Sequence, residues 1–327
     1  MPQFCAGAAG GPPSAPEALR GAALGARGAE YVQLLGALTN AANAFKSEQN
    51  ALMELWAKFF DHPTRTELAL LDRHAPELAE CIGADAEIVE FGAGASRKVR
   101  LLLSALQRPV GFVPVDISGE HLAEAAERLR AEHPGLIVRP LVGDYTVEGL
   151  QLPPPAGRRV GFYPGSSIGN FEPPWAVRLL ERYRRWLQGG GLLIGVDLVK
   201  SPALLHAAYN DAQGVTAAFN LNLLARANRE LGADFDLAAW EHAAHYQPSL
   251  QRIEMHLVSR RAQQVRLGGE RFDFDEGESI HTENSYKYSV AGFQALARRA
   301  GWAPQAVWID GARRFSLHWL QPASTEP

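Results

Sequence analysis

Cysteine is scarce in this chain of 327 residues, which has only Cys5 and Cys81. Two cysteines cannot form the disulfide framework of a small secreted domain, and no Cys or His cluster has the spacing of a zinc site. No run of about 18 apolar residues is present, so the sequence predicts no membrane span. The N-terminus lacks the basic-then-apolar order of a secretory signal, and we therefore expect a protein of the reducing cytoplasm.

An excess of positive charge is missing as well. Lys and Arg number 32 against 36 Asp and Glu, which gives a net charge of −4. Proteins that collect nucleic-acid phosphates usually carry a basic patch, whereas the arginine pairs of this chain are dispersed among apolar and acidic residues. We therefore expect no nucleic-acid partner. We also expect a small-molecule substrate, no membrane partner and a monomer.

Core-forming residues are plentiful, since 46% of the chain is hydrophobic, which suffices for one large domain or two closely built ones. Residues 1–30 are the exception, because Ala, Gly and Pro dominate there and bury too little to offset chain entropy. We predict a disordered tail. Apolar spacing over 31–55 predicts helices, and Thr64 is expected to cap a helix that runs to Cys81.

Apolar strands alternate with amphipathic helices from residue 87 onward, which is typical of a doubly wound, Rossmann-like α/β sheet. The predicted strands are 87–91, 110–116, 136–142, 159–163 and 192–197, and the predicted helices are 97–106, 118–132 and 174–187.

The alternation stops after residue 200. Residues 202–245 have a helical pattern, and residues 250–280 resemble strands of an antiparallel sheet. We interpret this segment as an inserted, smaller α+β domain. A helix at 291–300 and strands at 303–310 and 315–321 then complete the first sheet.

A Gly92-Ala93-Gly94 turn directly follows the first predicted strand and precedes a helix, where the backbone can approach a ligand closely. Such a turn can bind a nucleoside cofactor or a dinucleotide, or simply pack a helix on a strand. The dinucleotide version expects a third glycine at the position of Arg97, which disfavours it.

Acidic residues end the next two strands. Asp116 stands where a carboxylate can accept both hydroxyls of a ribose, although an Asp there also suits a helix N-cap. Asp144 ends the third strand, where an adenine amine is usually met in this fold. Ligands bind outside the carboxyl ends of parallel strands, so these positions predict one nucleoside site. Glu90 before the glycines and the lack of a Walker sequence favour S-adenosylmethionine over NAD. Lys98 can bind the carboxylate in the methionine part of this cofactor, or it can be an exposed helix lysine.

Eight segments carry longer motifs: EFGAG (90–94), VPVD (113–116), VGDY (142–145), PGSSIGN (164–170), DLVK (197–200), YNDAQGVTAAFN (209–220), RIEM (252–255) and TENSYKY (282–288). Together they resemble the L-histidine Nα-methyltransferases of ergothioneine biosynthesis, which convert histidine to its trimethylated betaine. The likeness covers the chain from about residue 63 to the C-terminus.

The resemblance implies a methyltransferase domain of residues 63–200 and 286–327 and a substrate-binding domain of residues 31–62 and 201–285. It implies that the cofactor is bound by Gly92, Lys98, Asp116, Asp144 and Tyr145. It further implies that Asn170 and Tyr209 hold the amine and carboxylate end of the substrate during the transfer. Glu283 and Ser285 would bind the imidazole, with Asn284 between them in the same substrate-binding segment.

The side chains suit these roles. The Asn170 amide can donate to a carboxylate and accept from an amine, although Asn after glycine is also ordinary turn chemistry. Glu283 can accept an imidazole N–H and favour the charged ring while Ser285 serves the other nitrogen, unless the pair is merely a polar strand edge. We expect in-line displacement at an aligned amine, without a metal and up to three times. His281 is a less favoured base, because a loop histidine is more often solvated.

One segment departs from the family pattern, because Asp61 stands where the family has a substrate tyrosine before Pro-Thr-Arg. An Asp there can bind an ammonium, so a methyltransferase for a different small amine or amino acid is the alternative function. A non-catalytic nucleoside-binding regulator is a further alternative. The segment Glu241 to His245 superficially resembles a zinc helix, but its histidines have a spacing of i, i+3 rather than i, i+4.

Overall fold

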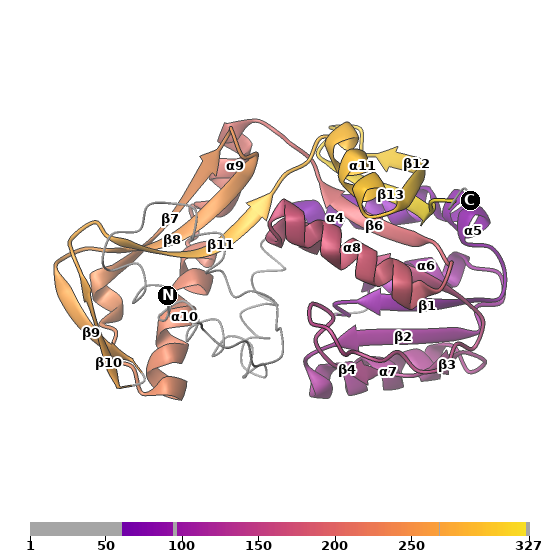
Figure 1. Ribbon diagram of the computed structural model, residues 1–327, viewed down its shortest axis with the longest axis horizontal. Coiled ribbons are helices and arrows are strands. Elements are labelled where there is room, and N and C mark those ends of the chain that lie inside the picture. The colour runs from indigo at the N-terminus through magenta and orange to yellow at the C-terminus, as the bar shows by residue number, and fades with distance from the viewer. Residues whose placement is uncertain (1–60, 94–96, 268, 325–327) are drawn as a thin grey trace, which may run out of the picture.

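The computed structural model describes residues 61–93, 97–267 and 269–324. The predicted tail of residues 1–30, the predicted helices before residue 61 and Gly94 of the glycine turn lie outside this part of the chain. Figure 1 shows a large sheet with helices on both faces and, beside it, a smaller sheet accompanied by the helices α9 (Pro202–Tyr209) and α10 (Val215–Leu231).

The large sheet has the strand order β12-β13-β6-β5-β1-β2-β3, and β4 also pairs with β2. Its strands are β1 (Ala86–Phe91), β2 (Gly111–Asp116), β3 (Ile137–Val138), β4 (Leu141–Val142), β5 (Arg158–Tyr163), β6 (Leu192–Asp197), β12 (Trp302–Ile309) and β13 (Phe315–Pro322). The strands from β6 to β3 are paired in parallel, and β13 runs antiparallel to both of its neighbours. The predicted doubly wound α/β architecture is thus confirmed.

Two apolar cores lie on opposite faces of this sheet. Every residue of β1 and of β6 is buried, as expected for central parallel strands covered on both sides. One core packs α8 (Pro173–Leu187) and α11 (Val290–Arg299) against the sheet. The other core packs α4 (Asp61–Arg73), α5 (Ala75–Ile82), α6 (Arg97–Ala105) and α7 (Gly119–Glu132). These two cores hold the carboxyl ends of the strands in place.

Two predicted elements are interrupted by proline. The strand predicted at 136–142 is two short strands, β3 and β4, because Pro140 between them has no N–H for a ladder hydrogen bond. The helix predicted to run to Cys81 is two helices, since Pro76 in the first turn of α5 is incompatible with a continuous helix. Thr64 lies inside α4 and not at its N-cap.

The smaller sheet is antiparallel, with the order β11-β8-β7. Its strands are β7 (Trp240–Gln247), β8 (Arg252–Ser259) and β11 (Ser279–Tyr286), and a hairpin of β9 (Gln263–Leu267) and β10 (Glu270–Phe274) lies next to it. The helical prediction for residues 240–245 was wrong. These residues pair with β8 along their whole length, and Trp240 packs edge-on against Phe274, so tertiary packing outweighs the helix propensity of Glu and Ala.

The chain passes from the large sheet to the smaller one after β6 and returns after β11. In Figure 1 the arrowheads of β1 and β2 point toward the side on which β7, β8 and β11 lie. The carboxyl ends of the parallel strands therefore face the smaller sheet. Within the described ranges, no helix has the length and apolarity needed to cross a membrane.

Gly190, in the turn between α8 and β6, has no room for a side chain. A Cβ atom there would lie 1.7 Å from the carbonyl oxygen of Arg159, which is backbone and cannot rotate away. We expect Gly190→Ala to lower the free energy of unfolding by about 2–3 kcal/mol in urea titrations. Gly135→Ala is the control, since a Cβ there meets no described atom within 4 Å, and an equal loss in both variants would contradict this account.

Candidate active site

Gly92 follows β1 with a φ of +78°, a backbone conformation that favours glycine. Its N–H donates to the Val115 carbonyl at 2.9 Å, which ties the turn to the end of β2. A Cβ atom at Gly92 would lie 3.3 Å from the Tyr145 hydroxyl oxygen. The structure therefore brings two of the predicted cofactor residues, Gly92 and Tyr145, next to each other at the carboxyl ends of the strands.

Asp116 and Asp144 both accept a hydrogen bond from backbone two residues further on. The Asp116 Oδ1 atom accepts the Ser118 N–H at 2.8 Å, and the Asp144 Oδ1 atom accepts the Thr146 N–H at 2.8 Å. Such turns hold each carboxylate at the end of its strand. Asp116 is not the N-cap of α7, because Ser118 occupies that position. The two carboxylates thus follow neighbouring parallel strands, as the spacing predicted.

Tyr145 lies in an aromatic group with Phe91, Tyr163 and Tyr183, and its ring meets that of Tyr163 edge-on at a centroid distance of 5.8 Å. Burial raises the pKa of Tyr145 to about 12, so its hydroxyl stays protonated near neutral pH. Tyr145 thus joins this aromatic group to Gly92 and to its chain neighbour Asp144.

Glu90 is 3% exposed, and its Oε2 atom has no hydrogen-bond partner in the described part of the chain. Burial raises the pKa of Glu90 to about 8, and the positive charge of Lys98 offsets this only in part. A buried carboxylate oxygen without a partner is costly unless a ligand donor meets it. Together with the strand-end aspartates, Glu90 fits a nucleoside cofactor that also carries an ammonium group.

Lys98 forms an ion pair with Glu67, with 2.6 Å between Nζ and Oε2. Glu67, on α4, is fully buried and also accepts the Gly165 N–H at 2.9 Å. The pair therefore joins α6 to the turn after β5. Glu67 was not singled out from the sequence, because nothing local indicates that an acidic residue of α4 reaches a lysine 31 positions later and a glycine near 165.

Tyr209, at the end of α9, and Ser285, on β11, are buried and hydrogen-bonded to each other, with 2.8 Å between their oxygens. The ammonium of Lys287 lies between them, 2.9 Å from the Tyr209 oxygen and 2.7 Å from the Ser285 oxygen. Lys287 also pairs with Asp197, at the end of β6, at 2.9 Å. Tyr209 and Ser285 are predicted site residues, whereas Lys287 and Asp197 are not, although both lie within the motifs TENSYKY and DLVK.

Glu283 and Ser285 alternate along β11 opposite Met255 and Ile253, so they lie on the same face of the smaller sheet. Burial raises the pKa of Glu283 to about 7, and the charge of Lys287 opposes that rise. The structure thus brings Glu283, Ser285 and Tyr209 to one side of β11.

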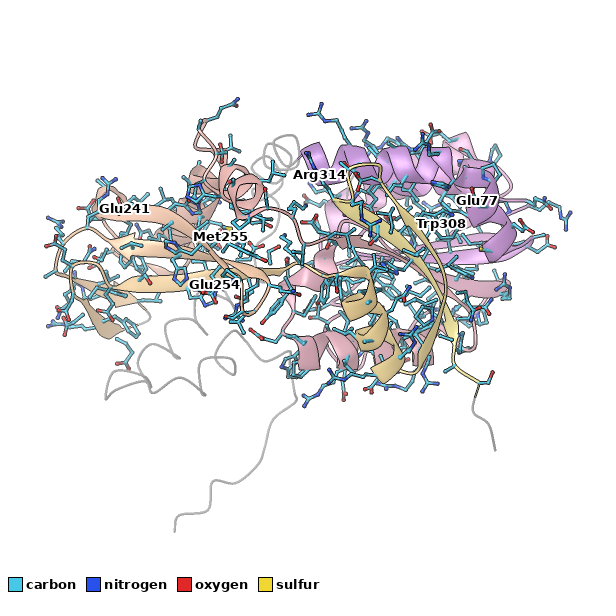
Figure 2. All side chains as sticks on the ribbon, turned by 90° about the horizontal axis from the view of Figure 1, so that it is seen from above. Glu77, Glu241, Glu254, Met255, Trp308 and Arg314 are labelled. Carbon is cyan, nitrogen blue, oxygen red and sulfur yellow. The ribbon has the colours of Figure 1, made fainter. Side chains whose placement is uncertain are left out.

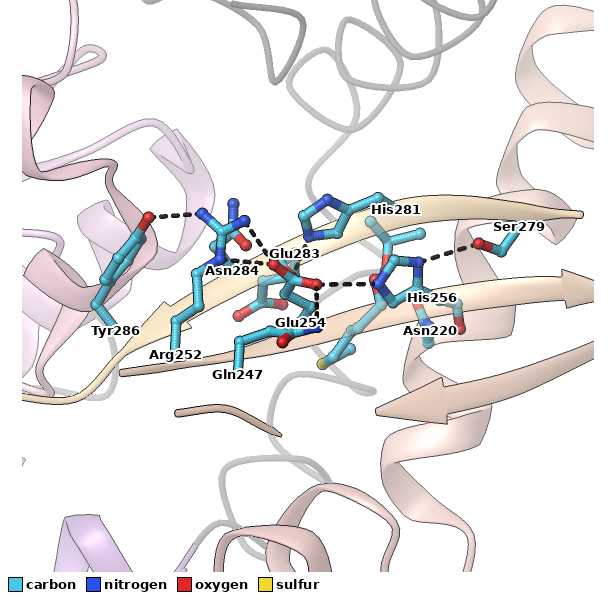
Figure 3. Close-up of polar contacts among 12 residues, drawn as sticks. Asn220, Gln247, Arg252, Glu254, His256, Ser279, His281, Glu283, Asn284 and Tyr286 are labelled. Atoms are coloured by element: carbon cyan, nitrogen blue, oxygen red, sulfur yellow. Dashed lines mark hydrogen bonds and ion pairs between the residues drawn. The ribbon is translucent and has the colours of Figure 1, made fainter. Parts of the chain in front are cut away.

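Asn284 and His281 belong to the opposite face of β11. Asn284 donates to Glu172 at 3.3 Å, and His281 stacks on His256 with ring centroids 4.7 Å apart. Figure 3 shows these side chains beside the ion pair of Arg252 and Glu254. Asn284 therefore lies on the other face of β11 from Glu283 and Ser285, the residues with which it was predicted to bind the substrate.

Asn170 ends a short 3-10 turn, η1 (Ser167–Asn170), that follows β5, and its side chain is exposed. Gly169, in the same turn, packs against β11 so closely that a Cβ atom there would lie 2.7 Å from the Tyr286 carbonyl oxygen. Asn170 is thereby carried to the junction of the two sheets. The predicted cofactor positions belong to one side of this junction, and Glu283 and Ser285 belong to the other.

The histidines of β7 do not form a metal site. His242 and His245 are three residues apart on a strand, so their side chains project to opposite faces. Among the residues that the structure describes, no group of three or more His, Cys, Asp or Glu side chains can hold a metal ion. Figure 2 shows Glu241 and Glu254 at separate places on the smaller sheet.

Residues 54–322 match the model of a protein family described as histidine-specific, SAM-dependent methyltransferases. The chain is 41% identical to a histidine N-alpha-methyltransferase of Mycolicibacterium smegmatis, over 78% of this chain and 81% of the relative. It is 39% identical to the protein of the same name from Mycobacterium tuberculosis, with the same coverage. It is 30% identical to the ergothioneine biosynthesis protein 1 of Neurospora crassa over 79% of this chain and 30% of that larger protein. This chain therefore belongs to the family of histidine-specific, S-adenosylmethionine-dependent methyltransferases.

Proposed function

We propose that this chain transfers methyl groups from S-adenosylmethionine to the α-amine of free L-histidine, up to the trimethylated betaine, in ergothioneine biosynthesis. The observation that carries the proposal is the placement of Glu283 and Ser285 on one face of β11, across the junction from the strand ends of the large sheet. An acidic acceptor and a hydroxyl two residues apart suit the two nitrogens of an imidazole. The names of the relatives support the same substrate.

Mass spectrometry of free amino acids incubated with the enzyme and S-adenosylmethionine tests the proposal. We expect mass increases of one to three methyl groups on histidine. Product from another amino acid and none from histidine would favour the alternative, a methyltransferase for a different small amine or amino acid. This alternative is suggested by Asp61, at the start of α4, in place of the family's tyrosine. Cofactor binding without any product would favour a regulator.

The cofactor would be held by Gly92, Asp116, Asp144 and Tyr145, with Glu90 and Lys98 toward its amino-acid end. S-adenosylmethionine supplies a methyl group that its positive sulfonium activates for transfer. Asp116 would accept the ribose hydroxyls, and Asp144 the adenine amine. Glu90, whose buried oxygen has no partner in the described chain, would accept from the ammonium of the methionine part.

The protein's own task is to present a neutral amine to the methyl carbon in line with the bond that breaks. Asn170 would orient the amine and carboxylate of the substrate through its amide. The family resemblance implies that Tyr209 holds the amine and carboxylate end of the substrate. Its hydroxyl contacts Ser285, so in our proposal it orders the imidazole side of the site instead. The amine proton would leave to water or to a nearby carboxylate, because His281 lies on the far face of β11. The cytoplasmic location, the monomeric state and the absence of nucleic-acid partners stay predictions.

Cofactor binding is expected to release about one proton near pH 7. With a pKa of about 8, Glu90 is mostly protonated in the free chain at that pH, and an ammonium placed against it lowers this pKa and expels the proton. Calorimetry in buffers of different ionisation enthalpy measures the release. Glu90→Gln should abolish it, and a release that persists in this variant would contradict the assignment.

A further inference from the structure

Lys287 is buried just after β11, and its ammonium meets three oxygens of the site. These are the hydroxyl of Tyr209 at 2.9 Å, the hydroxyl of Ser285 at 2.7 Å and the Asp197 carboxylate at 2.9 Å. An ammonium has three N–H donors, so each donor has its acceptor. Lys287 is therefore fully occupied in holding its neighbours and has no donor left for a substrate.

These contacts restrict how the hydroxyls of Tyr209 and Ser285 can donate and accept hydrogen bonds. The Ser285 oxygen accepts an N–H from Lys287 and the O–H of Tyr209, at 2.8 Å from the Tyr209 oxygen. A serine hydroxyl has two acceptor lone pairs and one donor hydrogen, and the phenol is the stronger donor of the two groups. Both lone pairs of Ser285 are used within this arrangement. What Ser285 can still offer to a ligand is its O–H.

We propose that Lys287 is a positioning residue that makes Ser285 a hydrogen-bond donor, so that the site selects the neutral imidazole of its substrate. Ser285 donates to the ring nitrogen that carries no hydrogen. Glu283, about 7 Å away along the same strand face, accepts the N–H of the other nitrogen. A charged ring carries an N–H on both nitrogens, so one N–H would face the Ser285 O–H and two donors would meet without an acceptor. This inference rests on the proposed function. It replaces the expectation from the sequence that Glu283 favours a charged imidazole.

The charge of the bound ring can be tested on the unmodified enzyme. The amino acid 3-(1,2,4-triazol-3-yl)alanine keeps nitrogens at both imidazole positions, and its ring stays uncharged near neutral pH. With S-adenosylmethionine present, we expect its kcat/KM to lie within about tenfold of that for histidine. A larger loss, with histidine methylated normally, would overturn the selection of a neutral ring. If histidine itself is not methylated, the proposed function fails instead.

The role of Lys287 is tested against a second lysine on the same carboxylate. Lys200 also pairs with Asp197, but no described contact joins it to Tyr209 or Ser285. We expect Lys287→Met to raise KM for histidine by about 10- to 100-fold, with kcat and cofactor affinity within about threefold of the parent. Lys200→Met should leave KM within about threefold. Equal effects would mean that Lys287 only neutralises Asp197 and would overturn the positioning role.

Tyr209→Phe provides a second route if Lys287→Met does not fold. Removal of the phenol O–H frees one lone pair of Ser285, so this serine is no longer restricted to donating. We expect KM for histidine to rise by about tenfold while cofactor affinity stays unchanged. An unchanged KM would overturn the hydrogen-bond arrangement proposed for Ser285.

Discussion

Replacing Glu283 with alanine is expected to lower kcat/KM for histidine by about 100-fold and to leave the affinity for S-adenosylmethionine unchanged. Glu283 lies on the same face of β11 as Ser285, where its carboxylate can accept a ring N–H. A hydrogen bond to a charged group contributes about 1.5–3 kcal/mol, which corresponds to about 10- to 150-fold in affinity. Steady-state kinetics with histidine and calorimetry with the cofactor measure the two quantities separately.

Glu283 is also expected to make the ligand-free protein less stable at high pH than at low pH. Burial raises the pKa of Glu283 from 4.5 to about 7, so the folded chain binds more protons than the unfolded chain between these values. The contribution of Glu283 to stability is therefore most favourable below pH 4.5, falls as pH rises through about 7 and is level above that. Glu283→Gln should raise the free energy of unfolding by about 1–2 kcal/mol near pH 8 and change it little near pH 4.5.

Glu241→Gln is the matched control for both measurements. Glu241 is exposed on β7 of the same sheet and pairs with Arg260 at 3.2 Å. Its loss should leave kcat/KM and the free energy of unfolding within experimental scatter of the parent. A Glu283 variant that loses stability at every pH together with activity would indicate a structural role and would count against substrate binding by this carboxylate.

Replacing Asp116 with alanine is expected to weaken the binding of S-adenosylmethionine by about 100-fold. A carboxylate that accepts two ribose hydroxyls makes two charge-assisted hydrogen bonds, and alanine makes neither. Asp116→Asn keeps an oxygen for the Ser118 N–H, which Asp116 binds at 2.8 Å, so the turn is retained and the loss should be about tenfold. Isothermal titration with the cofactor gives both values.

Asp85→Ala provides the comparison for Asp116. Asp85 stands before β1, at the opposite end of the sheet, where it pairs with Arg108 at 2.8 Å in an exposed position. Its removal should leave cofactor affinity unchanged, because exposed ion pairs contribute little and this one is remote from the carboxyl ends of the strands. Similar losses in both aspartate variants would contradict a ribose contact by Asp116.

The convergence of the predicted cofactor residues at one edge of the sheet was largely predictable. In a parallel sheet every strand ends at the same edge, so polar residues directly after successive strands converge without any knowledge of distances. Gly92, Asp116 and Asp144 follow this rule. Two predicted elements failed for a local reason, because Pro140 and Pro76 interrupt them. The helix predicted at 240–245 failed through long-range packing, since these residues pair with β8.

The placement of the residues predicted to bind the substrate depended far more on the tertiary structure. The residues 283–285 are consecutive in the sequence, yet the pleat of β11 places Asn284 near Glu172 and the other two on the opposite face. The partners of Ser285 are similarly remote, because Tyr209 lies 76 positions earlier in the chain. Sequence motifs can mark such residues, but they cannot tell which face each one occupies.

The sequence by itself determined the doubly wound fold and the membership in the methyltransferase family, because strand periodicity, turn chemistry and long motifs are local properties. Only the tertiary structure decided the protonation and hydrogen-bond direction of the site. Burial raises the pKa values of Glu90 and Glu283, and the contacts of Ser285 with Lys287 and Tyr209 leave this serine its O–H to donate. Desolvation and long-range contacts exist only once distant segments have packed together, so a local sequence pattern does not predict them.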